Sequence, residues 1–228
     1  VQDAITFPTI MVTDTRERGY SADVAASATK TSTTIESIPQ SVVVVPQALI
    51  EDQVATTLAE ALQNVSNVKG FDQRDVSMEN SFRIRGFSAG VTVDGVAAPG
   101  YFSNQEPIIN VEQIDVVKGP TGSLYGASQS LGPGANNVGG MIAITSKAPE
   151  KIARREVGIR AGSYKNQAVS FDLNQPINEQ FGIRLVGEAQ RNNSETDRVT
   201  SKTLFIAPSI SWKPNATSQL TARMRQTD

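Results

Sequence analysis

The residues that could carry out catalysis are few and lack partners. The chain contains no cysteine and no histidine, which removes thiol nucleophiles, the commonest zinc ligands and imidazole as acid or base. Acid and hydroxyl groups occur at Asp94, Glu112, Asp115 and Ser123. No base is visible beside them, and we interpret them as residues that cap turns. The sequence therefore indicates a protein that is not an enzyme and that needs no cofactor or metal ion.

A second group of residues is suited to contacts with a ligand or with another protein surface. Arg83 and Arg85 share one side of a short alternating segment whose other side is apolar, which predicts a half-buried strand. The two cations either meet solvent or pair with carboxylates on an enclosing surface. A later loop carries adjacent aromatic residues, Tyr101 and Phe102. This loop either forms a contact surface or packs against the core.

The elements that position these residues form a compact α/β unit in our interpretation. Val42–Val45 predicts a buried strand, and a Thr-x-x-Glu capping box at 57–60 opens a helix with an apolar stripe. Further strands are predicted at 114–117 and 141–146, and Asp94-Gly95 predicts a tight turn. The glycine-rich stretch between the last two strands requires a backbone that runs close to another surface. It lacks the Gly-x4-Gly-Lys-Ser/Thr pattern of a phosphate-binding loop.

After Pro149 the pattern changes to alternating segments, apolar on one face and charged or small on the other. Five segments are expected, around 157–162, 169–174, 183–190, 204–212 and 220–225, with connections at 163–166, 176–180, 192–202 and 214–218. This alternation is typical of a membrane β-barrel with a polar lumen and equally of a soluble β-sandwich. The charged positions of these segments, Arg160, Asp172, Arg184 and Glu188, suit a wet interior in either case.

The first 36 residues are rich in Thr, Ser and Ala and read as an extended arm. The segment from Ile5 to Thr13 within it has residues that favour β-structure. It is either disordered or a stray edge strand, or it adds as a strand to the sheet of a partner protein.

The net charge of −2 gives no electrostatic footprint for nucleic acid. No apolar run approaches the roughly 18 residues of a membrane helix. No signal peptide is visible at Val1, so an exported protein would be present here in a processed form.

Five spaced motifs resemble the plug of TonB-dependent siderophore receptors. They are Ser-Ile-Pro-Gln-Ser-Val at 37–42, Ile-Arg-Gly-Phe at 84–87, Val-Asp-Gly at 93–95, Val-Val-Lys-Gly-Pro with Leu-Tyr-Gly at 116–126, and Gly-Gly-x-Ile-x-Ile-x-Ser-Lys-x-Pro at 139–149. In that family a globular plug fills a barrel of about 22 strands. The resemblance implies a periplasmic arm with a TonB box at 1–34, an α/β plug at 35–150, and the first five or so antiparallel strands of a transmembrane β-barrel at 151–228.

The resemblance also implies a function and its partners. A receptor of this family sits in the outer membrane of a Gram-negative bacterium, contacts its lipid, and takes up a ferric siderophore with energy supplied by TonB. The plug and the arm would face the periplasm. Five strands cannot close such a barrel, so we expect this chain to be the N-terminal portion of a longer protein. The alternatives are another scarce nutrient, such as a cobalamin or a saccharide, and a soluble β-rich binding module.

Three sets of site residues follow from the resemblance. The ligand contacts it implies are Arg74, then Phe87, Ser88 and Gly90 in an expected loop at 87–90, and Tyr101 and Phe102. The TonB box has two candidate registers, one around Ile5, Thr6 and Phe7 and a favoured one at Thr9, Ile10, Met11, Val12 and Thr13. Arg85 and Lys118 match a pair of plug cations that the family locks onto barrel glutamates. The second of these is an arginine in the family, and lysine keeps its charge but not its bidentate geometry.

Overall fold

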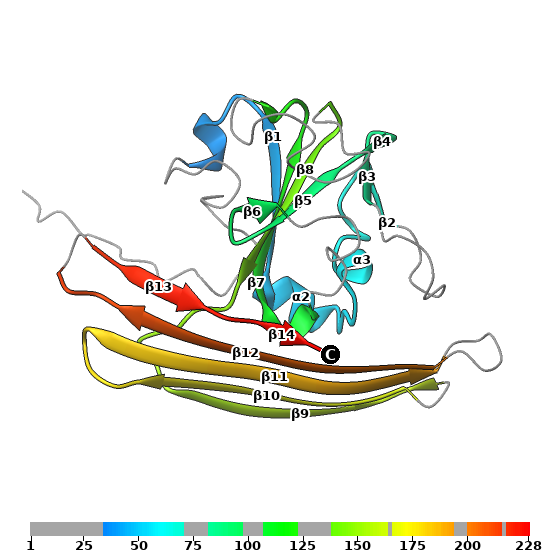
Figure 1. Cartoon of the computed structure of the whole chain (residues 1–228). Helices are drawn as coiled ribbons and strands as arrows, with labels where there is room; N and C mark the ends of the chain where they lie inside the picture. Colours follow the sequence, from blue (N-terminus) through cyan, green and yellow to red (C-terminus); the bar gives the residue numbers. More distant parts are fainter. Residues whose placement is uncertain are drawn as a thin grey trace, which may run out of the picture.

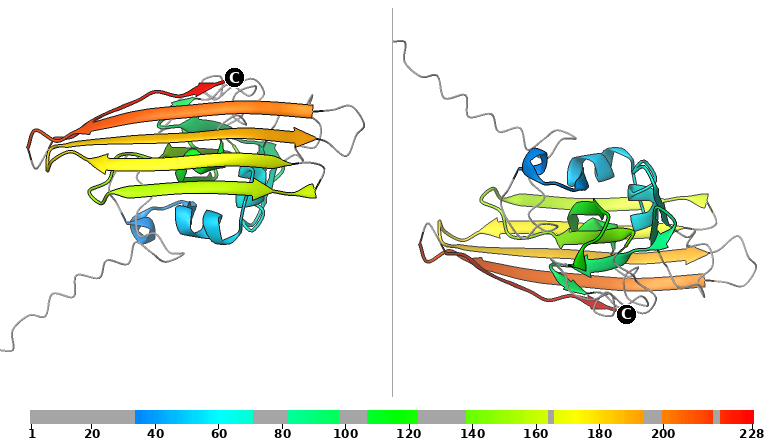
Figure 2. Two further views of the ribbon diagram at one scale, coloured as in Figure 1. Left: turned by 90° about the horizontal axis from the view of Figure 1, so that it is seen from below. Right: turned by 90° about the horizontal axis from the view of Figure 1, so that it is seen from above.

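The computed structural model describes residues 34–70, 82–97, 107–122, 138–163, 166–193, 200–215 and 218–228. It has two layers: a small domain of mixed secondary structure, built from residues 34–146, rests on one face of a curved antiparallel sheet (Figure 1). The long strands of the curved sheet run side by side and extend past the small domain (Figure 2). None of the helices within the described ranges combines the length and the apolar character that crossing a membrane requires.

The small domain contains the helical segments η1 (Ile35–Ser37), α2 (Gln47–Asp52), α3 (Leu58–Ala61) and η2 (Ile108–Asn110), and the strands β1 (Ser41–Pro46), β2 (Val68–Gly70), β3 (Phe82–Ile84), β4 (Phe87–Ser88), β5 (Gly90–Val93), β6 (Val96–Ala97), β7 (Val111–Lys118) and β8 (Gly140–Ser146). The curved sheet contains β9 (Arg154–Ala161), β10 (Gln167–Pro176), β11 (Phe181–Asn193), β12 (Thr200–Trp212), β13 (Leu220–Arg223) and β14 (Gln226–Thr227).

The small domain is organised around a five-stranded sheet in the order β1-β7-β8-β5-β6. β8 pairs antiparallel with β7 and parallel with β5, so the sheet is mixed. Successive residues of β8 point to opposite sides of it: Ile142 and Ile144 enter the main core with α2 and α3, whereas Met141 and Ala143 pack under β1. A separate three-stranded sheet, β2-β3-β4, completes the domain. The predicted mixed α/β fold is confirmed.

Local sequence signals account for several of these elements. The Thr57 hydroxyl accepts a hydrogen bond from the Glu60 backbone N–H at 3.2 Å, as a capping residue does. The reciprocal bond of the capping box is shifted by one residue, because the Glu60 carboxylate accepts from the backbone of Thr56. Asp94 and Gly95 both have positive φ, which gives the predicted tight hairpin between β5 and β6.

Gly140 shows why the Gly-Gly pair must precede β8. Its φ is +133°, and a Cβ at this position would lie 2.0 Å from the carbonyl oxygen of Val117 on the neighbouring strand. Only glycine allows this backbone conformation and this approach at once. The predicted close contact of the glycine-rich stretch is therefore observed at its C-terminal end, where β7 and β8 begin to pair.

The curved sheet has two chemically different faces. Large apolar side chains point away from the small domain and are exposed, among them Val157, Ile159, Val169, Leu204 and Ile210. Small, polar and charged side chains point toward it and are buried, among them Ala168, Asp172, Asn174, Arg184 and Glu188. The alternation predicted after Pro149 is thus confirmed. The charged face is not wet over its whole area, because the small domain covers part of it.

Two expectations about the connections are corrected. Polar residues at 192–202 predicted a long connection, but β11 continues to Asn193 and β12 begins at Thr200, since backbone pairing between these strands tolerates their polar side chains. The stretch from Phe87 to Gly90 was expected as a loop and instead contains β4 and the first residue of β5. The arm at 1–33 lies outside the described residues.

Candidate functional site at the junction of the two layers

The two layers are joined by a set of four charged residues, which we call the junction cluster: Lys147, Glu150, Asp172 and Arg184. Lys147 directly follows β8, and its Nζ lies 2.8 Å from Oδ2 of Asp172 on β10. Arg184 on β11 binds the same carboxylate with two nitrogens, Nε at 2.8 Å from Oδ1 and Nη2 at 2.9 Å from Oδ2. This planar, two-bond geometry is the strongest form of an arginine–carboxylate pair.

The remaining donors and acceptors of the cluster are also used. Nη1 of Arg184 donates to the Glu150 carboxylate at 2.7 Å and to the carbonyl oxygen of Ala148 at 2.8 Å. The cluster contains two cations and two anions, so its charge is balanced. Lys147, Asp172 and Arg184 are all at most 4% exposed. Buried charges are tolerated only when they are paired and hydrogen-bonded in this way.

Asn174 on β10 fixes the linker between the layers. Its amide oxygen accepts from the Glu150 backbone N–H at 3.0 Å, and its amide nitrogen donates to the carbonyl oxygens of Glu150 and Ile152. An asparagine side chain therefore replaces the backbone partners that this irregular segment lacks. The chain between β8 and β9 is held against the inner face of the curved sheet.

A second polar contact holds the small domain internally, next to the junction. The Asp94 carboxylate, in the turn after β5, accepts hydrogen bonds from the backbone N–H and the hydroxyl of Ser146. Arg223 of β13 lies 3.9 Å from the same carboxylate. Asp94 thus caps a turn, as the sequence indicated, and also receives a cation from the curved sheet.

Glu112 lies at an irregular point in the pairing of β7 with β8, between Val111 and Gln113. Burial raises the pKa of its carboxyl above the ordinary value, an effect that the Arg184 charge opposes and the Glu150 charge reinforces. Glu112 therefore extends the electrostatic environment of the junction cluster into the small domain.

Apolar contact between the layers is limited. Val186 and Phe205, with Ala207, form a small cluster on the inner face of the curved sheet, and Ile109 of η2 packs against it. The main core of the small domain is a separate cluster. Charged and polar groups thus supply much of the specific contact between the layers.

The two predicted lock cations, Arg85 and Lys118, both lie in the small domain. Lys118, at the end of β7, is 7% exposed and donates from Nζ to the Ser66 hydroxyl at 2.9 Å. Burial lowers the pKa of its amine, and the nearby charge of Arg85 lowers it further. The two predicted lock cations are therefore neighbours. Their pairing with glutamates of a barrel stays a prediction.

The predicted ligand contacts are only partly described. Phe87 is 48% exposed and belongs to β4, which lies on the side of the small domain away from the curved sheet (Figure 1). Ser88 is the next residue of β4, and Gly90 is buried in β5 beside Met141. Arg74, Tyr101 and Phe102 lie outside the described residues, as do both TonB-box registers. The role of all these residues in binding stays a prediction.

The junction cluster was missed as a unit by sequence reasoning. Asp172 and Arg184 were placed on the charged face of their segments, and Lys147 belongs to the Ser-Lys-x-Pro motif, but no pairing was predicted. One signal was available: a lysine directly after a buried strand must be neutralised if the next alternating segments cover it. Opposite charges on the covering face supply that partner.

Comparison with known proteins agrees with this architecture. Residues 34–132 match the family described as TonB-dependent Receptor Plug Domain. The ferrioxamine receptor of Yersinia enterocolitica is 29% identical over 213 residues, which cover 90% of this chain and 29% of the receptor. The ferrioxamine B receptor of Salmonella typhimurium is 30% identical over 203 residues, covering 83% of this chain and 27% of the receptor. The chain thus spans less than a third of the length of these relatives.

A solved structure extends the likeness to both layers. The siderophore receptor PiuA from Acinetobacter baumannii superposes with a TM-score of 0.77 at 25% identity, over 93% of this chain and 30% of PiuA. The match includes the curved sheet as well as the small domain, because residues 34–146 alone are too few to reach that coverage. Residues 34–132 of the small domain therefore form a TonB-dependent receptor plug domain, and the chain as a whole is similar to siderophore receptors that contain such a plug.

Proposed function

We propose that this chain is part of an outer-membrane receptor that takes up a ferric siderophore with energy from TonB. The observation that carries the proposal is the two-faced curved sheet, apolar outside and polar where it meets the plug. This arrangement suits a barrel wall in lipid around a plugged lumen. The relatives named above are ferrioxamine and siderophore receptors, which supports a ferric siderophore as the ligand.

The mechanism moves the substrate without changing it chemically. Ligand binds on the outward side of the plug, with Arg74, Phe87, Ser88, Gly90, Tyr101 and Phe102 as the proposed contacts. Binding changes the exposure of the N-terminal arm on the periplasmic side. TonB then pairs with the arm as an added strand and pulls, so that the plug moves and a path opens. The energy comes from this partner, since the sequence contains no phosphate-binding loop.

An uptake experiment tests the proposal. The receptor, produced at its natural full length in a strain without other ferric hydroxamate receptors, is expected to import iron-55 supplied as ferrioxamine B, the ligand for which the Salmonella typhimurium relative is named. Deletion of residues 3–13 is expected to abolish uptake and to leave binding of the chelate to cells intact. Uptake that survives this deletion would show that the arm does not transmit energy.

A parallel measurement separates the alternative substrates. The same strain is supplied with labelled cobalamin or with a panel of labelled oligosaccharides at equal concentration. Import of one of these, without import of any ferric chelate, would keep the architecture and replace the substrate. A protein that stays monodisperse in buffer without detergent would instead support a soluble binding module.

A further inference from the structure

On β11 and β12, the outer face of the curved sheet is bounded at both ends by residues that differ from the apolar surface between them. At one end Phe181 of β11 and Trp212 of β12 stack with their ring centroids 5.9 Å apart. At the other end Arg191 and Lys202 stand opposite each other on the same two strands. The outward residues between these rows are apolar: Ile183, Leu185, Gly187 and Ala189 on β11, and Leu204, Ile206, Pro208 and Ile210 on β12.

The spacing of the two rows matches the thickness of a membrane. Phe181 and Arg191 are separated by about ten residues of continuous strand, or roughly 33 Å along it. A barrel strand tilted by roughly 40° would convert this length to about 25 Å along the membrane normal. The apolar band of an outer-membrane barrel has that height, with an aromatic row at its edge. Arg191 and Lys202 therefore stand at the level of lipid headgroups.

The pairing of Arg191 with Lys202 needs an anion to explain it. Like charges directly opposite each other across two strands repel and destabilise the pair. Both side chains are exposed, and neither forms an ion pair or a side-chain hydrogen bond within the part of the chain that the structure describes. Gln167 of β10 is aligned with Arg191 in the same row and adds an amide donor. Three donors in one row suit a phosphate group.

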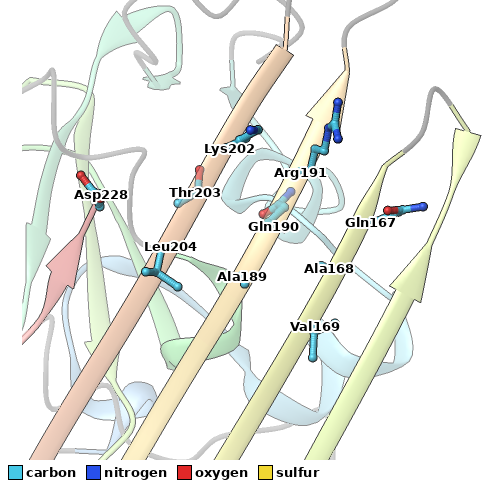
Figure 3. Close-up of a pocket in the computed structure, with 10 residues that line it drawn as sticks. All are labelled: Gln167, Ala168, Val169, Ala189, Gln190, Arg191, Lys202, Thr203, Leu204 and Asp228. Atoms are coloured by element: carbon cyan, nitrogen blue, oxygen red, sulfur yellow. The ribbon is translucent and has the colours of Figure 1, made fainter.

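A hollow lies directly beside this row on the apolar surface. Its volume is about 550 Å³, and Figure 3 shows Arg191 and Lys202 at one end of it, with Val169, Ala189 and Leu204 beneath them. The small side chain of Ala189 leaves the space between its larger neighbours Val169 and Leu204. Asp228 also lines the hollow. It pairs with Leu204, which lies two residues along β12 from Lys202, toward the apolar band. The shape suits one end of an acyl chain below a charged headgroup.

We propose that Arg191 and Lys202, assisted by Gln167, bind the phosphate of a membrane lipid whose acyl chain lies in the hollow over Ala189. The proposal rests on the outer-membrane placement proposed above. The occupant is a phosphate-bearing membrane lipid, because the cations supply the charge complementarity and the apolar hollow adjoins them. A free phosphate ion would leave the hollow unused.

The test is equilibrium binding of phosphatidic acid with a fluorescent acyl chain to the full-length receptor in uncharged detergent micelles. Each cation near an anionic lipid contributes roughly five-fold, so the double variant Arg191→Gln/Lys202→Gln is expected to lose roughly thirty-fold in affinity. Arg155→Gln is the matched control, because Arg155 is also an exposed cation on the outer face but is aligned with Leu173 and Leu185 instead of with the row of Arg191 and Lys202. It is expected to change affinity less than two-fold. Ala189→Leu, which fills the hollow, is expected to weaken binding with both cations in place.

Three outcomes would overturn the proposal. They are equal binding of labelled diacylglycerol, which lacks the phosphate; displacement by inorganic phosphate at the concentration of the lipid; and an equal loss in Arg155→Gln and in the double variant. Iron uptake by cells that carry the same variants keeps the two proposals separate. If the unsubstituted receptor imports no ferric chelate but binds phosphatidic acid as expected, the substrate assignment fails and the lipid site stands.

Discussion

Replacement of Asp172 by asparagine tests whether the junction cluster holds the plug to the wall. Asp172 is 1% exposed and is the shared partner of Lys147 and Arg184. Among the described residues, its neutralisation leaves Lys147 without a carboxylate partner and Arg184 with Glu150 alone. Breaking a buried pair by removing one partner costs about 3–5 kcal/mol, because the other charge cannot be solvated. We expect a loss of this size in the free energy of plug unfolding.

The loss can be measured by thiol labelling. These 228 residues contain no cysteine, so Ala143→Cys introduces a probe in β8 that is buried until the plug opens. The labelling rate in moderate urea reports the population of the open state. A loss of 3–5 kcal/mol should accelerate labelling by about a hundred- to a few-thousand-fold.

A matched control sets the threshold for rejection. Arg154 and Glu156 form a pair at 3.6 Å whose side chains are 34% and 55% exposed. Exposed pairs contribute only about 0–1 kcal/mol, so Glu156→Gln should change labelling by less than roughly five-fold. If Asp172→Asn has an effect no larger than this control, the cluster does not stabilise the plug. The triple variant Lys147→Met/Asp172→Leu/Arg184→Met removes the three buried charges together and leaves only the partly exposed Glu150, so it should recover most of the loss.

Three further predictions follow from other residues. The folded-state pKa of Glu112 is raised, so the folded protein binds the Glu112 proton more tightly than the unfolded chain does. The free energy of unfolding should therefore fall as the pH rises from 4.5, which urea midpoints measured from pH 4 to 8 would show. Glu112→Gln should remove this fall. Proline cannot donate a backbone hydrogen bond, so Ile10→Pro should abolish iron uptake while Ile5→Pro preserves it, and the reverse result would select the other TonB-box register. Gly140→Ala should destabilise the plug by more than Gly86→Ala in the labelling assay, because both have positive φ but only Gly140 would also clash with a neighbouring strand; equal losses would contradict this reason.

Local patterns predicted the strands and turns well. The apolar stripe at Leu58, Ala61, Leu62 and Val65 is buried as expected, because helical periodicity determines which side of a short helix can enter a core. The alternation after Pro149 predicted which residues of each strand share a face. Alternation alone could not show which face is covered, because a soluble sandwich has the same period. The structure shows that the plug covers part of the charged face.

Long-range pairing was beyond the reach of local patterns. Lys147 and Asp172 are 25 residues apart, and their contact depends on how the linker lays β8 against β10. Lys118 was expected as a lock residue, yet its observed partner is Ser66, on a segment 52 residues away. Neither pairing leaves a periodic trace in the sequence. They follow from the tertiary arrangement.

The polar character of the plug–wall contact has a consequence for reversible movement. If the plug moved away, Asp172, Arg184 and Glu188 would meet water, which solvates charges well. They would also keep their partners within the curved sheet, because Asp172 pairs with Arg184 and Glu188 pairs with Arg160. An apolar contact of the same area would instead cost roughly 25 cal/mol for each Å² wetted. Within the described residues, the apolar contact between the layers is the small cluster of Val186, Phe205 and Ala207 with Ile109. A polar inner face of this kind can hold the plug firmly while the contact is dry and present a hydrated, non-adhesive surface once the plug has moved.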